Sequence, residues 1–181
     1  YKRSGVKESA EKYKLEKFGK IIGHTYELMV NDDLDAFTRI PARLGVRARE
    51  KENEMMWNLI TSNSGAGQVM LEDGNNLFDG SNHGNVGTAG SISVSTIGEG
   101  REAMRLMKDL DGELISGLSP RYLVVPAALE TEADKFVTNI TPDNAGNVNP
   151  FGGRLQTIVE PRLDAISSGA YYLMADKSML D

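Results

Sequence analysis

The segment over residues 119–139, SPRYLVVPAALETEADKFVTN, constrains the fold more than any other part of the chain. Residues 122–125 are typical of a short buried strand. Pro126 follows, and proline suits a first helical turn because it has no N–H group to satisfy. One apolar helix face is then predicted from Leu129, Ala133, Phe136, Val137 and Ile140. A strand therefore runs directly into an amphipathic helix.

Other elements alternate irregularly along the chain. Residues 155–160 and 171–175 are predicted strands, with a turn at Ser167-Ser168-Gly169 between them. Residues 96–99 match a capping box, which predicts a helix that begins there and ends near residues 111–112. Its apolar face would consist of Ile97, Met104, Met107 and Leu110. This irregular order predicts an α+β fold.

A long helix is predicted before these elements. Asn31-Asp32-Asp33 is typical of a helix N-terminus. Because proline breaks a helix interior, we expect a break at Pro41 and a second helix over residues 41–61, roughly 31 Å long. Its apolar residues gather at the two ends, with a charged run over residues 49–52. The i,i+3 pairs expected to support its middle are Arg47/Glu50, Arg49/Glu52 and Lys51/Glu54.

The first part of the chain, over residues 1–30, is polar and predicts an extended arm. Residues 21–30 are compatible with a strand, but the segment has little that could bury itself. We therefore expect the arm to pack on something else. Lysines and arginines gather in the first 20 positions and are interleaved with Glu8, Glu11 and Glu16, which favours a solvated mixed-charge segment. Since the first residue is Tyr1 and not Met, we expect a fragment or a processed product.

Composition narrows the class of protein. A chain of 181 residues is long enough for one domain or two small lobes with a real core. It has no cysteine, which excludes disulfides and thiolate catalysis. A net charge of −6 argues against a nucleic-acid-binding surface. The sequence contains no stretch typical of a membrane span or a signal peptide.

Candidate chemistry is sparse. The Ser-, Asn- and Gly-rich loop over residues 62–91 contains His83, four residues after Asp79, and a loop-ordering hydrogen bond explains this histidine better than a metal or acid-base site. The glycines of HGNVGTAG match no phosphate-binding motif. The paired carboxylates are better explained by helix capping and turns: Asp32, Asp33, Asp109 and Asp111. The residues predict no enzyme, no catalytic or metal-binding residue, and no cofactor.

Six motifs in order carry a family resemblance: HTYELMVNDDLDAF, RAREKENEMMWNLI, LFDGSNHGN, GREAMRLMKDLDGE, PRYLVVPAALETEA and EPRLD with YYLMAD. Together they resemble the major head subunits of Mu-like tailed phages, which share the capsid fold named after phage Hong Kong 97. The resemblance implies an E-loop-like arm over residues 1–30 and a peripheral-type domain over residues 31–117 that holds the spine helix. An axial-type domain over residues 118–181 would follow, with closing strands expected beyond both ends of the chain.

This resemblance implies a structural subunit of an icosahedral phage or prophage head. Copies would form hexamers and pentamers that enclose DNA without sequence-specific binding, in the virion and, during assembly, in the host cytoplasm. Scaffolding protein or a prohead protease would be assembly partners, and no membrane would be involved. The expected assembly interface consists of Tyr13, Leu15, Phe18, Ile21, Met55 and Trp57. Two alternatives stay open, a maturation protease or other hydrolase fragment, and a non-shell virion adaptor.

Overall fold

The computed structural model describes residues 11, 15, 17–21, 23, 25–30, 36–138 and 148–179. A small mixed sheet forms the centre of the globular part of the protein, which we call the body. Strand β1 (Pro120–Val125) pairs in parallel with β2 (Gln156–Val159) and antiparallel with β3 (Tyr172–Ala175), in the order β2-β1-β3. Leu123 lies opposite Thr157 on one side and Leu173 on the other. The three predicted strands and the α+β class are thereby confirmed.

The hydrophobic core lies against this sheet. Leu123 and Val125 of β1 are fully buried, together with Ala133 from the following helix. Leu129, Phe136 and Val137 pack against them, so the predicted helix face is confirmed, while Ile140 lies outside the described residues. The same cluster includes Ile92, Ile97, Phe151 and Leu155. One core therefore joins residues from both sides of the predicted boundary at residues 117–118, and that boundary stays a prediction.

Pro126 begins a helical segment, as predicted, but the first turn is tighter than an α-helix. Pro126 caps the 3₁₀ turn η2 (Ala127–Leu129), which continues into α4 (Glu130–Val137). The Asp164 carboxylate accepts hydrogen bonds from the N–H groups of Ala127 at 2.7 Å and Ala128 at 3.2 Å. Asp164 belongs to a second 3₁₀ turn, η4 (Pro161–Ala165), and a third, η5 (Lys177–Met179), follows β3. One carboxylate thus satisfies two otherwise unpaired amides where η2 starts.

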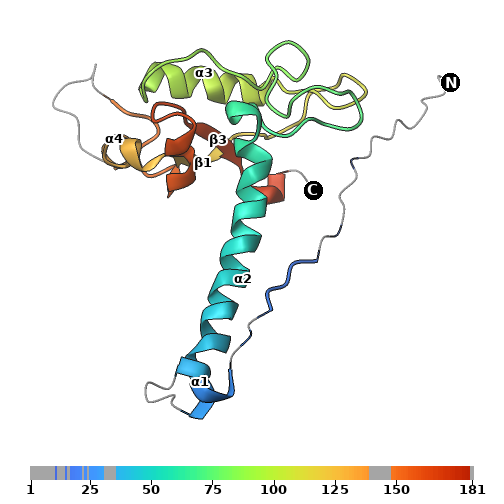
Figure 1. Cartoon of the computed structure of the whole chain (residues 1–181). Helices are drawn as coiled ribbons and strands as arrows, with labels where there is room; N and C mark the ends of the chain where they lie inside the picture. Colours follow the sequence, from blue (N-terminus) through green and yellow to red (C-terminus); the bar gives the residue numbers. More distant parts are fainter. Residues whose placement is uncertain are drawn as a thin grey trace.

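Helix α2 (Ala36–Thr61) is continuous, so the predicted break at Pro41 is wrong. Proline removes the hydrogen bond to the carbonyl four residues earlier. Pro41 lies near the exposed start of the helix, where water can satisfy that carbonyl. The helix is about 39 Å long at 1.5 Å per residue. Figure 1 shows it leaving the body as a shaft, with its C-terminal end at the body. The predicted cap at residues 31–33 lies outside the described residues.

Helix α1 (Tyr26–Val30) stands where the sequence favoured a strand-compatible arm. That prediction is wrong for these five residues. Glu27, Leu28 and Met29 are good helix formers, and Glu27 lies in the first turn, where an acidic side chain is favourable. The described residues between 11 and 25 carry no helix or strand and follow α2 at a distance in Figure 1.

Helix α3 (Val94–Arg105) begins and ends earlier than predicted. Its cap is Ser93, whose Oγ accepts the N–H of Thr96, while the Thr96 hydroxyl accepts the N–H of Ser93. The predicted start at Thr96 was wrong because an extended serine three residues earlier forms the capping box. Beyond the helix, Asp109 accepts the N–H groups of Asp111 and Glu113, both at 2.9 Å. Asp109 therefore forms a turn, as predicted, but the turn lies beyond the end of the helix at Arg105.

The loop between α2 and α3 is ordered by its own contacts. It opens with η1 (Asn63–Gly65), and the Tyr172 hydroxyl donates to the Gly65 carbonyl at 3.3 Å. The Phe78 and Tyr172 rings lie 5.1 Å apart. Burial also raises the pKa of Tyr172. Tyr172 therefore joins the end of the α2 shaft to β3 of the body.

A substitution at Gly67 tests how closely this loop packs. Its φ is +78°, and an added Cβ would lie 2.6 Å from the Leu77 Cβ. We expect Gly67→Ala to lower stability by about 1–2 kcal/mol from the left-handed backbone and about 1–3 kcal/mol more from the steric clash. Gly74→Ala is the matched control, because its φ is +73° and its Cβ would meet nothing within 4 Å. Thermal unfolding measures both, and equal losses would contradict the clash.

Candidate functional site

The exposed shaft of α2 is the candidate functional site. In the described structure the helix contacts η1 and η4, both near its C-terminal end. Residues 41–50 are exposed throughout. A helix in a stable fold generally depends on tertiary packing of an apolar face and not on propensity alone. A shaft of this length therefore needs further contacts along its outer part.

Apolar residues follow the shaft along two sides. The arm-side stripe consists of Leu44, Ala48, Lys51, Met55 and Leu59, with one lysine at its middle. The outer stripe has Ala42, Val46, Met56 and Ile60 toward its two ends and the polar Arg49 and Asn53 at its middle. Both keep spacings of three or four residues, and at 3.6 residues per turn their centres lie roughly 140° apart. A helix that packs on one surface has one such stripe, so two stripes indicate contacts from two sides.

The arm reaches the first of these stripes. The Lys51 Nζ lies 5.4 Å from the centre of the Phe18 ring, a cation–π contact. Farther along, the Glu11 carboxylate accepts the N–H groups of Leu71 at 3.1 Å and Glu72 at 3.2 Å. The arm is thus held at two points, one on the shaft and one on the loop of the body.

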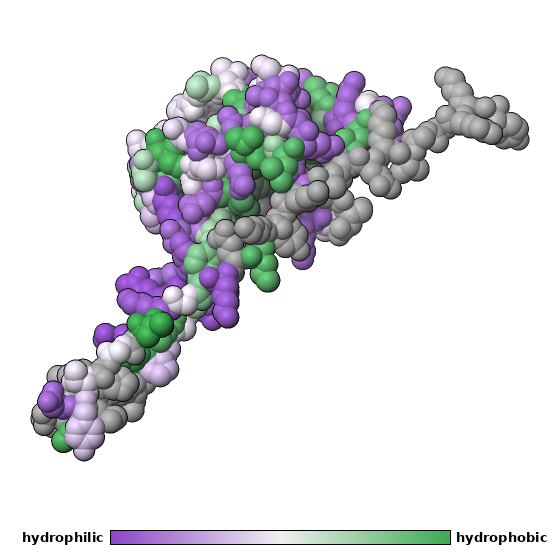
Figure 2. Space-filling model, turned by 45° about the vertical axis from the view of Figure 1, so that its right-hand side comes forward, coloured by the Kyte–Doolittle hydropathy of each residue, from purple (hydrophilic) through white to green (hydrophobic). Residues whose placement is uncertain are grey.

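The outer stripe has large apolar side chains in water. Val46 is 60 % exposed and Met56 is 65 % exposed. Figure 2 shows hydrophobic side chains interrupting the polar surface of the shaft below the body. Single exposed apolar residues are ordinary on a protein surface, but these two lie with Ala42 and Ile60 along one side of a helix that leaves the body, and we interpret this side as a contact surface.

The structure places the predicted interface residues in two groups. Leu15, Phe18 and Ile21 lie on the arm, and Leu15 and Ile21 are 92 % and 97 % exposed. Met55 lies on the arm-side stripe and Trp57 is half-buried nearer the body. Tyr13 lies outside the described residues. The arm and the shaft approach each other at Phe18, while their role in assembly stays a prediction.

A second apolar surface lies on the hairpin that follows α3. Lys108 and Leu114 form an isolated antiparallel bridge across the Asp109 turn. Three leucines on this segment are more than half exposed: Leu106, Leu110 and Leu114. This hairpin is a second place where a covered surface is expected.

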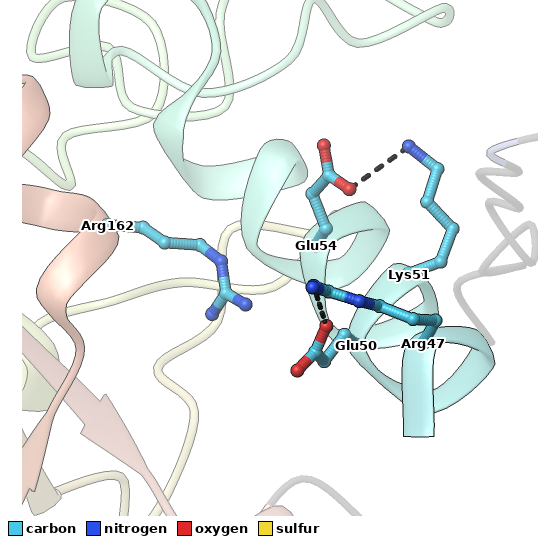
Figure 3. Close-up of a pocket in the computed structure, with 5 residues that line it drawn as sticks. All are labelled: Arg47, Glu50, Lys51, Glu54 and Arg162. Atoms are coloured by element: carbon cyan, nitrogen blue, oxygen red, sulfur yellow. Dashed lines mark hydrogen bonds and ion pairs between the residues drawn. The ribbon is translucent and has the colours of Figure 1, made fainter. Parts of the chain in front are cut away.

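A pocket of about 410 Å³ lies between α2 and η4. Figure 3 shows Arg162 facing Arg47, Glu50, Lys51 and Glu54 of the helix. Arg47 pairs with Glu50 at 2.7 Å and Lys51 with Glu54 at 3.1 Å, so two of the predicted pairs are present. Ligand pockets are mostly apolar with a few polar groups, whereas this lining is entirely charged. We interpret it as a solvated gap where the shaft meets the body.

His83 orders its own loop, as predicted. One ring nitrogen lies 3.1 Å from the Leu77 carbonyl and the other 2.8 Å from the Asp73 carboxylate. Asp79, the partner considered from sequence, instead accepts the N–H groups of Ser81 and Asn82. Both nitrogens of His83 are therefore committed to loop contacts.

These contacts predict a pH dependence. The hydrogen bond to Asp73 raises the pKa of His83 above its ordinary value of 6.5, while hydrogen bonds from Asn75 and then His83 lower the pKa of Asp73 to about 2. The stability from protonated His83 is thus complete below 6.5 and lost as pH rises through the folded pKa. We expect the Tm of the protein to fall across that window, and His83→Gln to remove the His83 contribution. Parallel Tm curves for both proteins from pH 5.5 to 8.5 would contradict this.

Within the described residues, no group of three or more His, Asp or Glu side chains is placed to hold a metal ion. Nor does any helix in the described part of the chain combine the length and the apolarity that a bilayer crossing requires.

Sequence reasoning missed two functional candidates. Val46 was not singled out, and Met56 was considered only together with Met55, as core filling or as adaptable packing at a subunit interface. Ala42, Val46, Met56 and Ile60 all lie within the predicted helix over residues 41–61, where Arg49 and Asn53 interrupt their apolar pattern. The Glu11 contact carried no local signal, since its partners are backbone amides 60 residues away.

Comparison with known proteins gives one match. A family model described as phage capsid protein matches residues 8–181. Searches of curated proteins and of solved structures each found no match. The matched range includes the arm, the α2 shaft and the body.

Proposed function

We propose that this chain, which belongs to the phage capsid protein family, is the repeating subunit of an icosahedral phage head. Members of such a family are structural, associate with copies of themselves in a shell, and reside in the virion. Copies of this chain form hexamers and pentamers that tile the shell around the genome.

The observation that carries the proposal is the outer stripe of α2. Val46 and Met56 are more than half exposed on a helix that leaves the body. Burying two aliphatic side chains of this kind stabilises a contact by about 3 kcal/mol or more. Repeated in every copy, such a contact supports closed rings of subunits.

The finer assignment follows the Hong Kong 97-type capsid fold in its Mu-like form. Residues 1–30 act as an E-loop-like arm, α2 as the spine helix of a peripheral-type domain over residues 31–117, and residues 118–181 as an axial-type domain. The arm and shaft residues predicted from sequence, among them Leu15, Ile21 and Met55, lie between copies. Exposure of the two arm residues supports this placement.

Partners follow from the same proposal. Copies of the chain are the principal partners, and scaffolding protein or a prohead protease acts during assembly in the host cytoplasm. The shell encloses DNA without reading its sequence. The net charge of −6 supports this, because an acidic wall does not hold phosphates tightly.

Assembly of the purified protein tests the proposal. We expect light scattering to detect multimers and electron micrographs to contain rings, sheets or shells. A protein that stays monomeric at high concentration, and that binds one other virion protein with fixed stoichiometry, would instead identify an adaptor.

A further inference from the structure

The turn that receives Glu11 is a small, well-defined structure. The Met70 N–H donates to the Asn75 carbonyl at 2.7 Å, and the Gly74 N–H donates to the Met70 carbonyl at 3.1 Å. Val69 and Asn76 form an antiparallel bridge beneath it. This tight closure leaves the successive N–H groups of Leu71 and Glu72 to meet the two oxygens of the Glu11 carboxylate.

Side-chain hydrogen bonds of Asp73 and His83 also fix this turn. The Asp73 carboxylate accepts the N–H and the side-chain amide of Asn75, both at 3.0 Å, and lies 2.8 Å from the His83 ring. His83 in turn contacts the Leu77 carbonyl. Because these bonds fix the backbone before any ligand arrives, the two amides are preorganised to bind an anion.

We infer that the amides of Leu71 and Glu72 form a carboxylate-binding site for the arm, and that in the assembled shell the occupant is Glu11 of a neighbouring copy. This exchange, in which the arm of one copy binds the turn of another, rests on the proposed shell function. The hydrogen bonds of Glu11 to these amides are present within the single chain.

The exposure of the arm favours exchange. Leu15 and Ile21, on either side of the Phe18 contact, are 92 % and 97 % exposed while the arm lies on its own body. A copy of the arm on a neighbour makes the same two hydrogen bonds through Glu11. Since nothing is lost at the binding site, any burial of Leu15 and Ile21 on the neighbour favours the exchanged form.

The carboxylate requirement is tested on the unassembled chain. Glu11→Gln keeps the size of the side chain but loses its charge, and charge-assisted hydrogen bonds are the stronger ones. We expect hydrogen exchange at the Leu71 and Glu72 amides to quicken several-fold in this variant. Glu132→Gln, an exposed neutralisation on α4, is the matched control and leaves these amides unchanged. Unchanged exchange in Glu11→Gln would overturn the site.

The exchange is tested by cysteine cross-linking, which is clean because the chain has no cysteine. Ala10→Cys, which puts the thiol next to Glu11 in the sequence and keeps its carboxylate, and Leu71→Cys are made in separate proteins, mixed, assembled and treated with a short bis-maleimide cross-linker. We expect a covalent dimer from the mixture, and little from Ala10→Cys mixed with Leu114→Cys, which places the second thiol on the exposed hairpin.

The possible results distinguish the exchange of the arm from the shell function and from the carboxylate-binding site. Assembled particles whose mixed proteins form no dimer, while the double variant Ala10→Cys/Leu71→Cys cross-links within one chain, would overturn the exchange and leave the shell function standing. A chain that does not assemble at all would overturn the shell function and the exchange with it. The hydrogen-exchange result would still decide the carboxylate site by itself.

Discussion

Replacing Val46 and Met56 together by serine is expected to abolish assembly while the isolated subunit stays folded. Both side chains are more than half exposed on the outer stripe of α2, so the subunit core does not depend on them. In an assembled contact, their loss removes about 3 kcal/mol or more of apolar burial. That corresponds to a weakening of roughly a hundredfold or more at each contact.

The matched control removes two charged side chains whose mean direction lies roughly 100° around the same helix from the centre of the outer stripe. Glu50→Ser with Glu54→Ser breaks the ion pairs with Arg47 and Lys51, each worth only a few tenths of a kcal/mol at a helix surface. We expect this protein to assemble nearly as the unchanged chain does. Light scattering against concentration and thermal unfolding measure both variants. Equal loss of assembly in the two would contradict a specific role for the outer stripe.

Leu123→Ala is expected to be the most destabilising single change to the body. Leu123 is fully buried at the middle of the central strand, between Thr157 and Leu173 of its neighbours. A leucine-to-alanine change in a core costs about 2–5 kcal/mol because a cavity remains. For a chain of this size, the Tm falls by roughly 2–4 °C for each kcal/mol.

Leu114→Ala is the control for this change. Leu114 is 57 % exposed on the hairpin, and a surface substitution of this kind usually changes stability by less than about 0.5 kcal/mol. Chemical denaturation measures both free energies of unfolding. A Leu123→Ala protein as stable as the Leu114→Ala protein would contradict the assigned core.

The sheet and its covering helix were predictable because their signals are local. The run of residues 122–125 is short, apolar and bounded by prolines, and the strand β1 that it forms is buried at Leu123, Val124 and Val125. The helical spacing of Leu129, Ala133 and Phe136 is likewise complete within eight residues. Such patterns depend on solvent exclusion along one element and little on the rest of the fold.

Helix boundaries were less predictable because several local rules competed. Proline inside α2 costs one hydrogen bond, which a continuous exposed helix tolerates at Pro41. At α3, Ser93 and Thr96 are both good caps, and the backbone path that follows Ile92 decides between them. A single sequence holds no information about that path.

The candidate site was predictable only in outline. Exposed apolar residues on an arm, such as Leu15 and Ile21, were recognisable because nothing near them in sequence could cover them. The docking of Glu11 on the amides of Leu71 and Glu72 was not, since backbone amides have no sequence signature. Contacts across 60 residues appear only once the chain is folded.

Hydrogen–deuterium exchange along α2, before and after assembly, tests most directly whether the shaft lies between copies. We expect the amides over residues 42–56 to exchange readily in the isolated subunit. In assembled particles they should become strongly protected, in step with loss of solvent access at Val46 and Met56. Assembled particles in which this stretch exchanges as fast as in the isolated subunit, while other surfaces become protected, would show that the shaft does not lie between copies.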